Sequence, residues 1–427
     1  MSCDILKEDS STNTNDAMYN NQNLKQYKKD GVYMSELMCR NIVVMKFNMD
    51  ESEYDVLHPE LLPWSLKDAI KKMPQKEDFS DIDKYIRTTI YYGNQNKDAI
   101  MYFITSRVLP LSRTNAKKIL TSLGMTPQMD NDTKYKLAKQ CRALTLQDDY
   151  WFREDNEQDI TWEKVNLRNN PLNNALIPVA LHGTPASLQG HIDSSPELTT
   201  QGAYAKAWIR EEDGLFLYKK GNTDPTEAKL EVEVSGLLDI CNVRHLHYER
   251  AERDDVVCCK CKLMSSDSIS MMHAEDFITY CNRHELDVEQ EVCKIDKDTF
   301  YKMWIVDYLI ANSDRHGLNW GFFYNPYTTK IISCHPLYDH NNAFDKELME
   351  NPDHVYIVNG RSMRDSAKFA MRQVDFHFTR EPERRDFLTT AHYHVFTQRA
   401  KELGIQVIKE TESNKEKTVV NEETEKE

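Results

Sequence analysis

The stretch "NSDRHGLNWG", Asn312–Gly321, concentrates more groups capable of chemistry than any other part of the chain. It combines an acid, two basic side chains, two asparagines and two glycines within ten residues. A polar run of this kind is usually a solvated surface loop, and the spacing of Asp314 and Asn319 is common by chance. The segments on either side decide whether the stretch is such a loop or part of an active site.

The flanking segments predict a buried helix before this stretch and a short hairpin after it. In "DKDTFYKMWIVDYLIANS" (296–313), the largely apolar positions share one helical face, namely Phe300, Met303, Trp304, Asp307 and Ile310. "WGFFYNPYTTKIISC" (320–334) predicts a strand, a turn at Asn-Pro and a second strand. The next segment, "HPLYDHNNAF" (335–344), places Asp339 at the exit of the hairpin.

A loop acid, an asparagine five residues later, a hairpin and a second acid follow the order of a kinase catalytic centre. In such a centre the first Asp accepts the proton of the substrate hydroxyl, and the Asn and the second Asp hold Mg²⁺ on the ATP phosphates. Mg²⁺ needs few protein carboxylates because phosphate oxygens and water complete its shell. Asp314 is therefore the candidate catalytic residue, and Asn319 and Asp339 are the candidate metal ligands.

Upstream, the sequence predicts the sheet that a kinase uses to hold ATP. "AYAKAWIR" (203–210) and "LFLYK" (215–219) alternate around the turn "EEDG", and "ASLQGHI" (186–192) would complete a meander of three strands. Lys219 closes the last strand, where a kinase places the lysine that binds the α- and β-phosphates.

The segment after Lys219 predicts a helix that supplies a carboxylate partner for this lysine. "PTEAKLEVEVSGLLDICNV" (225–243) has helical spacing, and we expect Glu231 to be the partner, with Glu227 and Glu233 as rivals. Two more strands are expected beyond it, at 243–250 and at 256–264. The loop "ELTTQGAYAK" (197–206) lies where phosphates would be covered, but with Gly202 alone it is not a G-x-G-x-x-G loop.

These motifs resemble those of the HipA-like kinases over roughly residues 180–400. The family's catalytic loop N-x-D-x-H-x-x-N matches "NSDRHGLN", its P-[LM]-Y-D matches "PLYD", and its phosphate loop S/T-x-x-G-x-x-x-K resembles "TTQGAYAK". The resemblance implies that Asp314 is the acid/base, that Asn319 and Asp339 bind Mg²⁺ and that Lys219 binds ATP. It also implies ATP contacts or supporting roles for further residues: Glu231, Thr199, Gly202 and Lys206 in nucleotide binding, and Asn312 and His316 beside the catalytic residue.

The expected fold is α+β, a bilobal protein-kinase-like fold with a small β-rich N-lobe and a helical C-lobe, preceded by a mainly helical region. The predicted organisation is a disordered tail (1–30), a mainly helical accessory region (31–175), the N-lobe (176–265), the C-lobe (266–410) and a second disordered tail (411–427). In the accessory region we expect one strand at "NIVVMKF" and helices at "SRTNAKKILTSLGM" and "TKYKLAKQCRALTL". "LTLQDDYWF" joins two Asp to Tyr150 and Trp151 and could be a site, but a capped helix start is the favoured interpretation.

Composition narrows the remaining possibilities. The 427 residues are 29% charged and 40% hydrophobic, which is typical of a soluble globular chain, and no apolar run is long enough to span a membrane. The net charge of −15 argues against direct binding of nucleic acid. Ten cysteines without a disulfide framework favour a reducing cytoplasm, and "CCKC" lacks the second cysteine pair of a zinc site, so a buried strand is the better interpretation.

Three functions stay open from the sequence: a serine/threonine protein kinase, which is favoured, a small-molecule kinase, and a pseudokinase that binds nucleotide without turnover. The acceptor is an unidentified protein or small molecule. Toxin members of the family carry an N-terminal subdomain that meets a DNA-binding antitoxin, and residues 31–175 do not match it, so an antitoxin-type partner stays an open possibility. Some members phosphorylate a serine of their own phosphate loop, and Thr199 stands nearest that position.

Overall fold

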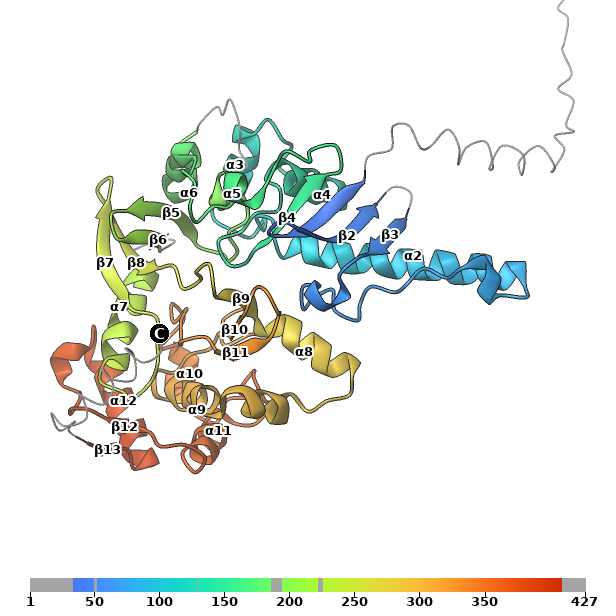
Figure 1. The fold of residues 1–427 in the computed structure, drawn as a ribbon. Helices are drawn as coiled ribbons and strands as arrows, with labels where there is room; N and C mark the ends of the chain where they lie inside the picture. The colour runs from blue at the N-terminus through green and yellow to red at the C-terminus, as the bar shows by residue number, and fades with distance from the viewer. Residues whose placement is uncertain (1–33, 50–51, 129, 186–193, 222–225, 409–427) are drawn as a thin grey trace, which may run out of the picture.

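The computed structural model describes residues 34–49, 52–128, 130–185, 194–221 and 226–408 (Figure 1). Both predicted tails and the predicted strand "ASLQGHI" lie outside these described residues. An accessory region and a small sheet-containing lobe lie side by side, and a mainly helical lobe packs against both (Figure 1). No helix in the described part of the chain is long and apolar enough to cross a membrane.

The accessory region is built on a four-stranded sheet in the order β3-β2-β1-β4. Its strands are β1 (Ser35–Cys39), β2 (Ile42–Asn48), β3 (Glu53–Val56) and β4 (Tyr150–Glu154). The sequence predicted β2 alone, and the other three strands are additions. They were missed because the paired segments are far apart in the chain: β1 pairs with β4 across more than a hundred residues, Ser35 opposite Glu154.

The helix start predicted at "LTLQDDYWF" is wrong, because Tyr150 begins strand β4. The Asp148 carboxylate accepts a hydrogen bond from the Tyr150 amide (3.0 Å), a contact two residues along the chain that makes a turn rather than a helix cap. Asp148 also holds Arg107 (2.6 Å), which ties this turn to the end of the long helix α2 (Ile82–Thr105). The aromatic residues after the turn suit a strand that is buried on both faces.

The remaining accessory helices are short: α3 (Ala116–Ser122), α4 (Asn131–Gln140), α5 (Trp162–Val165) and α6 (Ile177–His182). Helix α3 starts after Asn115, which has a positive φ of 67°, rather than at the predicted Ser112. The expected stop near Gly124 is present, since this glycine has a φ of +69° directly after the helix. The region is mainly helical, as predicted, but its core includes a sheet.

The small lobe is a four-stranded antiparallel sheet in the order β5-β6-β8-β7. Its strands are β5 (Ala205–Glu211), β6 (Gly214–Lys220), β7 (Tyr248–Arg253) and β8 (Val256–Lys262). Helix α7 (Thr226–Leu238) packs on β7 and β8. The expected order was three strands, a helix and two strands, and its first strand, "ASLQGHI", lies outside the described residues. The other two strands, the helix and the last two strands are present in that order, although β7 starts at Tyr248 rather than at residue 243. Cys258, Cys259 and Cys261 lie buried in β8.

The large lobe contains helices α8 (Ala274–Arg283), α9 (Val288–Leu309), α10 (Lys346–Glu350), α11 (Met363–Ala370) and α12 (Thr390–Leu403). Its sheet has the order β11-β10-β9, with β9 (Ser270–His273), β10 (Gly321–Tyr324) and β11 (Ile331–Cys334); a small pair, β12 (His377–Phe378) and β13 (Gln406–Val407), lies near its end. The predicted hairpin is therefore present, and β9 is an addition. Gly321 is required where β10 meets β9, because a Cβ there would collide with the Met272 carbonyl.

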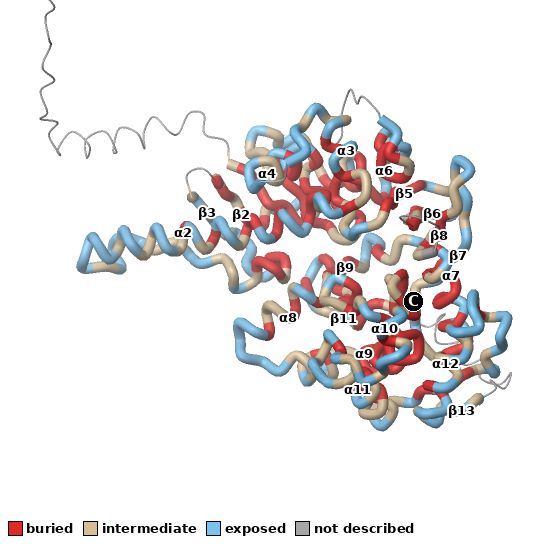
Figure 2. The backbone as a smooth tube through the Cα atoms, turned by 180° about the vertical axis from the view of Figure 1, so that it is seen from behind, coloured by how far each residue is buried: buried red, intermediate tan, exposed pale blue. Residues whose placement is uncertain are grey.

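Buried residues follow the interior of each lobe, whereas the first half of α2 extends away from the body with exposed residues (Figure 2). The last three turns of α9 are buried on all sides, from Thr299 to Leu309. This buried helix ends directly before the stretch Asn312–Gly321, so the polar loop is anchored on the core of the large lobe. The α+β, two-lobed fold with a preceding mainly helical region agrees with the prediction.

Candidate active site

A cavity of about 430 Å³ lies between the small sheet and the large lobe. Its lining includes Lys206 and Lys219 from the small lobe, and Asp314, Asn319 and Asp339 from the large lobe. The two lysines are opposite each other in the register of β5 and β6, so they project from the same face of the sheet. Residues separated by more than one hundred positions in the chain therefore share one cavity.

Lys219 connects the two lobes through two carboxylates. Its Nζ lies 2.7 Å from Oε1 of Glu231 on α7 and 2.8 Å from Oδ1 of Asp339. It also donates a hydrogen bond to the Tyr248 hydroxyl (3.1 Å). The second oxygen of Glu231 accepts the backbone N–H of His340 (2.9 Å), so the helix glutamate also holds the segment that carries Asp339.

The rivals of Glu231 do not approach Lys219 in this way. Glu233 faces the C-terminal part of the chain, where its carboxylate contacts His392 (2.9 Å) and accepts the Leu388 amide (2.8 Å). Glu227 lies in the first turn of α7, one turn before Glu231. Of the three candidate glutamates, Glu231 is the one that pairs with the strand lysine.

Lys219, Glu231 and Asp339 form a lysine triad, and its electrostatics follow from burial and mutual attraction. Burial opposes the charge on Lys219, but Asp339 and Glu231 outweigh it and hold the pKa of the lysine above its ordinary value. Burial would raise the pKa of Asp339, yet the charges of Lys219 and Lys206 lower it. For Glu231 burial prevails over Lys219, and its pKa is raised. The ion pair between Lys219 and Asp339 is therefore the strongly charged part of the triad.

Asp314 presents a half-exposed carboxylate to the cavity and is oriented by two amides. Asn342 donates to Oδ2 of Asp314 (2.9 Å), and Asn319 donates to the same oxygen (3.3 Å) and to the Asp314 carbonyl (2.7 Å). On the other side, Nε2 of His316 lies 3.5 Å from Oδ1. Because Oδ1 is the less engaged oxygen, it is the one that is available to accept a proton from a substrate hydroxyl.

The loop that carries Asp314 is braced by a buried ion pair. The Arg315 guanidinium and the Asp307 carboxylate are both fully buried and contact each other at 2.9 and 3.0 Å. Arg315 also donates to the backbone carbonyl of Asn319, one candidate metal ligand (2.5 Å), and to that of Tyr338, which directly precedes Asp339, the other (2.8 Å). One side chain thus fixes both halves of the site.

Asn312 and His316, the predicted supporting residues, stabilise the same loop. The amide of Asn312 donates to Asp307 (2.9 Å), and its Oδ1 accepts the Asp314 amide (3.3 Å). Nδ1 of His316 accepts the Leu318 amide (3.2 Å), which closes the tight turn before Asn319. Both side chains therefore act on the shape of the loop.

Asp339 and Asn319 offer the oxygen ligands that Mg²⁺ prefers. Asp339 has a left-handed backbone, with a φ of 59°, an uncommon conformation for a residue other than glycine and one that is concentrated at functional sites. Its Oδ1 accepts a hydrogen bond from Asn341 (3.0 Å). The side-chain nitrogen of Asn319 donates to Asp314, which leaves the side-chain oxygen Oδ1 of Asn319 for a cation. The donor set therefore fits a magnesium ion.

Gly202 and Lys206 lie together on the phosphate-loop side of the cavity. Gly202 has a φ of +96°, and a Cβ there would collide with the ammonium group of Lys206. Lys206 is 6% exposed, and burial, with a further contribution from Lys219, lowers its pKa to about 8. Within the described residues it forms no ion pair with a carboxylate, so the lysine is a buried cation without a fixed counter-ion.

Thr199 is placed differently from the other residues of the predicted phosphate loop. It is 5% exposed, and its hydroxyl donates to the Leu144 carbonyl (2.7 Å) in the accessory region. The hydroxyl is therefore not presented to the cavity as a phosphate ligand or as a phosphorylation site. The neighbouring Thr200 hydroxyl is likewise bound, to the Pro196 carbonyl (2.7 Å).

Several residues of the site were not identified from the sequence. Asn341 and Asn342 follow Asp339 and His340 in "YDHNN", and two amides close to a metal-type acid were a usable signal. Tyr204 reaches from the phosphate loop to Oδ1 of Asn342 (3.3 Å), and Tyr248 approaches Lys219 from β7. Neither tyrosine carries a sequence signal, because both contacts depend on the packing of the lobes.

No protein-family model matches the chain, and no curated protein matches it. Among solved structures, the Helicobacter pylori proinflammatory kinase CtkA resembles it with a TM-score of 0.32 and 12% identity, covering 49% of this chain and 90% of that one. HipA from Shewanella oneidensis MR-1, solved with HipB and its operator DNA, resembles it with a TM-score of 0.46 and 11% identity, covering 87% and 98%. Both are likenesses of fold at low sequence identity.

Proposed function

We propose that this chain is a phosphotransferase that moves the γ-phosphoryl group of ATP to a hydroxyl, most specifically that of a serine or threonine in a protein. The observation that carries the proposal is the convergence of Lys219, Asp339, Asp314 and Asn319 on one cavity between two lobes, with Glu231 paired to Lys219. Phosphoryl transfer needs positioning and charge compensation more than covalent chemistry, and this set supplies both.

Each residue has a distinct task in the proposed reaction. Lys219 and Lys206, on paired strands, are the cations that would hold the phosphates. Glu231 keeps Lys219 directed at the cavity. Asp314 orients the acceptor hydroxyl and takes its proton, while Asn319 and Asn342 fix the position of the carboxylate.

Asp339 and the side-chain oxygen Oδ1 of Asn319 would hold magnesium, which neutralises phosphate charge when bound. The close contact of Lys219 with Asp339 keeps the two lobes in register around the cavity. Asp339 combines a left-handed backbone with the ion pair to Lys219. These features support a site that is preorganised before substrate arrives.

The acceptor is tested by incubating the chain with labelled ATP and Mg²⁺ against a protein extract and, separately, against a pool of metabolites. The proposal predicts label in protein hydroxyls, lost in Asp314→Asn and retained in the control Asp213→Asn, whose acid is exposed in the β5–β6 turn. Label in metabolites alone would replace the protein acceptor by a small molecule. ATP binding without transfer to either pool would refute the proposed enzyme and indicate a pseudokinase.

A further inference from the structure

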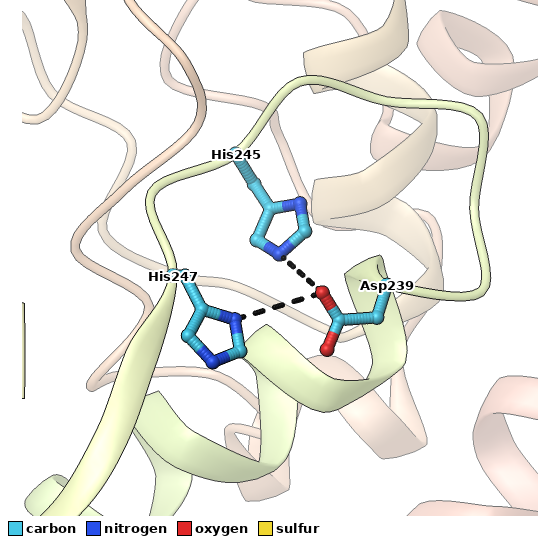
Figure 3. Close-up of side chains that lie close together, drawn as sticks. All are labelled: Asp239, His245 and His247. Atoms are coloured by element: carbon cyan, nitrogen blue, oxygen red, sulfur yellow. Dashed lines mark ion pairs between the residues drawn. The ribbon is translucent and has the colours of Figure 1, made fainter.

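A cluster of metal-ligating side chains lies outside the active-site cavity, at the junction between α7 and β7. Asp239 directly follows α7, and His245 and His247 lie on the segment that leads into β7. Figure 3 shows the two imidazole rings directed at the same carboxylate oxygen of Asp239. Within the described residues this is the one group of three such side chains whose donor atoms lie within 4.8 Å of one another.

The distances suit a shared metal ion. Nε2 of His245 lies 3.1 Å from Oδ1 of Asp239, and Nδ1 of His247 lies 3.6 Å from the same oxygen. A tetrahedral ion with nitrogen and oxygen ligands at about 2.0–2.2 Å separates its ligands by about 3.3 Å. The two observed separations lie on either side of that value, so an ion fits among the three atoms with small adjustments of the side chains.

The environment of His245 points to a ligand in the same place. Its side chain is 11% exposed, and Nε2 is shielded from solvent without a hydrogen-bond partner, although Asp239 is close.

The extended backbone places the two histidines on one side. Residues two apart in an extended segment share a face, so His245 and His247 point together while Leu246 between them turns to the active-site cavity. Nδ1 of His247 also lies 3.4 Å from the Ser235 hydroxyl, which accepts the Tyr248 amide (2.9 Å). Asp239 and His247 are 50% and 65% exposed, so water can complete the shell of an ion.

We propose that Asp239, His245 and His247 bind a divalent transition-metal ion of the zinc type, with water in the remaining coordination positions. Two imidazoles and one carboxylate suit Zn²⁺ and its neighbours in the first row, whereas Mg²⁺ prefers oxygen ligands alone. The site is therefore distinct in chemistry and in place from the magnesium ligands of the proposed kinase.

The ion would fasten the end of α7 to the segment that precedes β7. His245 forms an isolated parallel bridge with Leu337, and Leu246 donates to the Leu337 carbonyl (2.8 Å). Leu337 is two residues before Asp339, and α7 carries Glu231. Binding would thus tie together the two segments that hold the carboxylates of the lysine triad, and would raise the melting temperature because the ion binds the folded state.

The experiment measures zinc stoichiometry. The full chain is stripped with chelator, dialysed against Zn²⁺ and analysed for bound metal, in the wild type, in His247→Ala and in His284→Ala. His284 is a matched control, since its Nε2 lies 3.1 Å from Asp68 in an exposed pair without a third ligand. Because His247 is largely exposed, its replacement leaves the metal-free melting temperature unchanged.

The expected result is the loss of one equivalent of zinc, and of the zinc-dependent rise in melting temperature, in His247→Ala but not in His284→Ala. Co²⁺ in place of Zn²⁺ is expected to give the visible absorption of a site with imidazole ligands in the wild type and to lose it in the same variant. Equal zinc content in the wild type and His247→Ala, or the same loss in His284→Ala, would overturn the proposal.

Discussion

Replacing Lys219 with methionine would remove the cation that a buried and a partly buried carboxylate share. Glu231 is 1% exposed, and Asp339, 20% exposed, lies 2.8 Å from the lysine. Methionine fills much of the same volume, so the change deletes the charge with little change in packing. The fold would then hold two acids that have lost their shared ion-pair partner, with the charge of Lys206 remaining near Asp339.

The expected cost is large because one partner of a buried pair is removed. Breaking such a pair costs about 3–5 kcal/mol in the free energy of unfolding, since the remaining charge stays in a poor solvent. Two carboxylates depend on Lys219, so we expect the loss at pH 8 to lie in the upper part of that range.

The free energy of unfolding lost in Lys219→Met should depend on pH, and the direction follows from the pKa values of the two acids. In the wild type the pKa of Asp339 is lowered, so its contribution to stability is present above the ordinary pKa of an aspartate and is lost as the pH falls through the folded-state value. Without Lys219, burial raises the pKa of both acids, so the variant gains stability as the pH falls and they take up protons. The difference between wild type and variant should shrink by roughly 1–2 kcal/mol from pH 8 to pH 5, since one pKa unit is worth about 1.4 kcal/mol.

Urea unfolding of both proteins at pH 5 and pH 8, followed by tryptophan fluorescence, measures this difference. Lys206→Met is the matched control, because Lys206 lies opposite Lys219 in the sheet and is equally buried but forms no ion pair in the described structure. We expect it to be neutral or stabilising. If Lys219→Met cost no more than Lys206→Met, or cost the same at both pH values, the assignment of the triad would be wrong.

Three further outcomes follow from the site. Arg315→Met should lower the free energy of unfolding by about 3–5 kcal/mol, seen as a fall in melting temperature, because it leaves the fully buried Asp307 without its cation. An unchanged melting temperature would contradict the proposal that Arg315 braces the loop. Gly202→Ala should weaken ATP binding in calorimetry, since the methyl group enters the space of Lys206 and the residue has a positive φ, and affinity equal to the wild type would refute the close approach. ATP affinity should fall between pH 7 and pH 9, because Lys206 loses its proton above a pKa of about 8. Lys206→Met should flatten that dependence, and a wild-type affinity independent of pH would exclude phosphate binding by the Lys206 ammonium group.

The parts of the site that were predictable are those with a local pattern. The buried face of α9, the turn at Asn325-Pro326 and the acid after the hairpin each have a signal within about fifteen residues, and their order indicated a kinase. Lys219 and Glu231 were placed by the alternation of one strand and the helical spacing that follows it. Local periodicity and chain order together were sufficient for these residues.

The parts that were missed depend on contacts between distant segments. Strands β1 and β4 find each other across the accessory region, and strand propensity does not specify a partner. Tyr204 meets Asn342 across 138 positions, which only the packing of the lobes determines. Asp307 did carry a signal, because an acid on an otherwise apolar helix face needs a buried partner, and Arg315 lies eight residues further on.

Transfer of labelled γ-phosphate from ATP by the wild type and by Asp314→Asn, at saturating ATP and Mg²⁺, tests the central claim most directly. The account predicts that the wild type labels protein hydroxyls and that Asp314→Asn loses about 10²–10⁴-fold in rate, the usual contribution of a positioned base, while its melting temperature and ATP affinity stay close to those of the wild type. Undiminished transfer by Asp314→Asn would contradict the account.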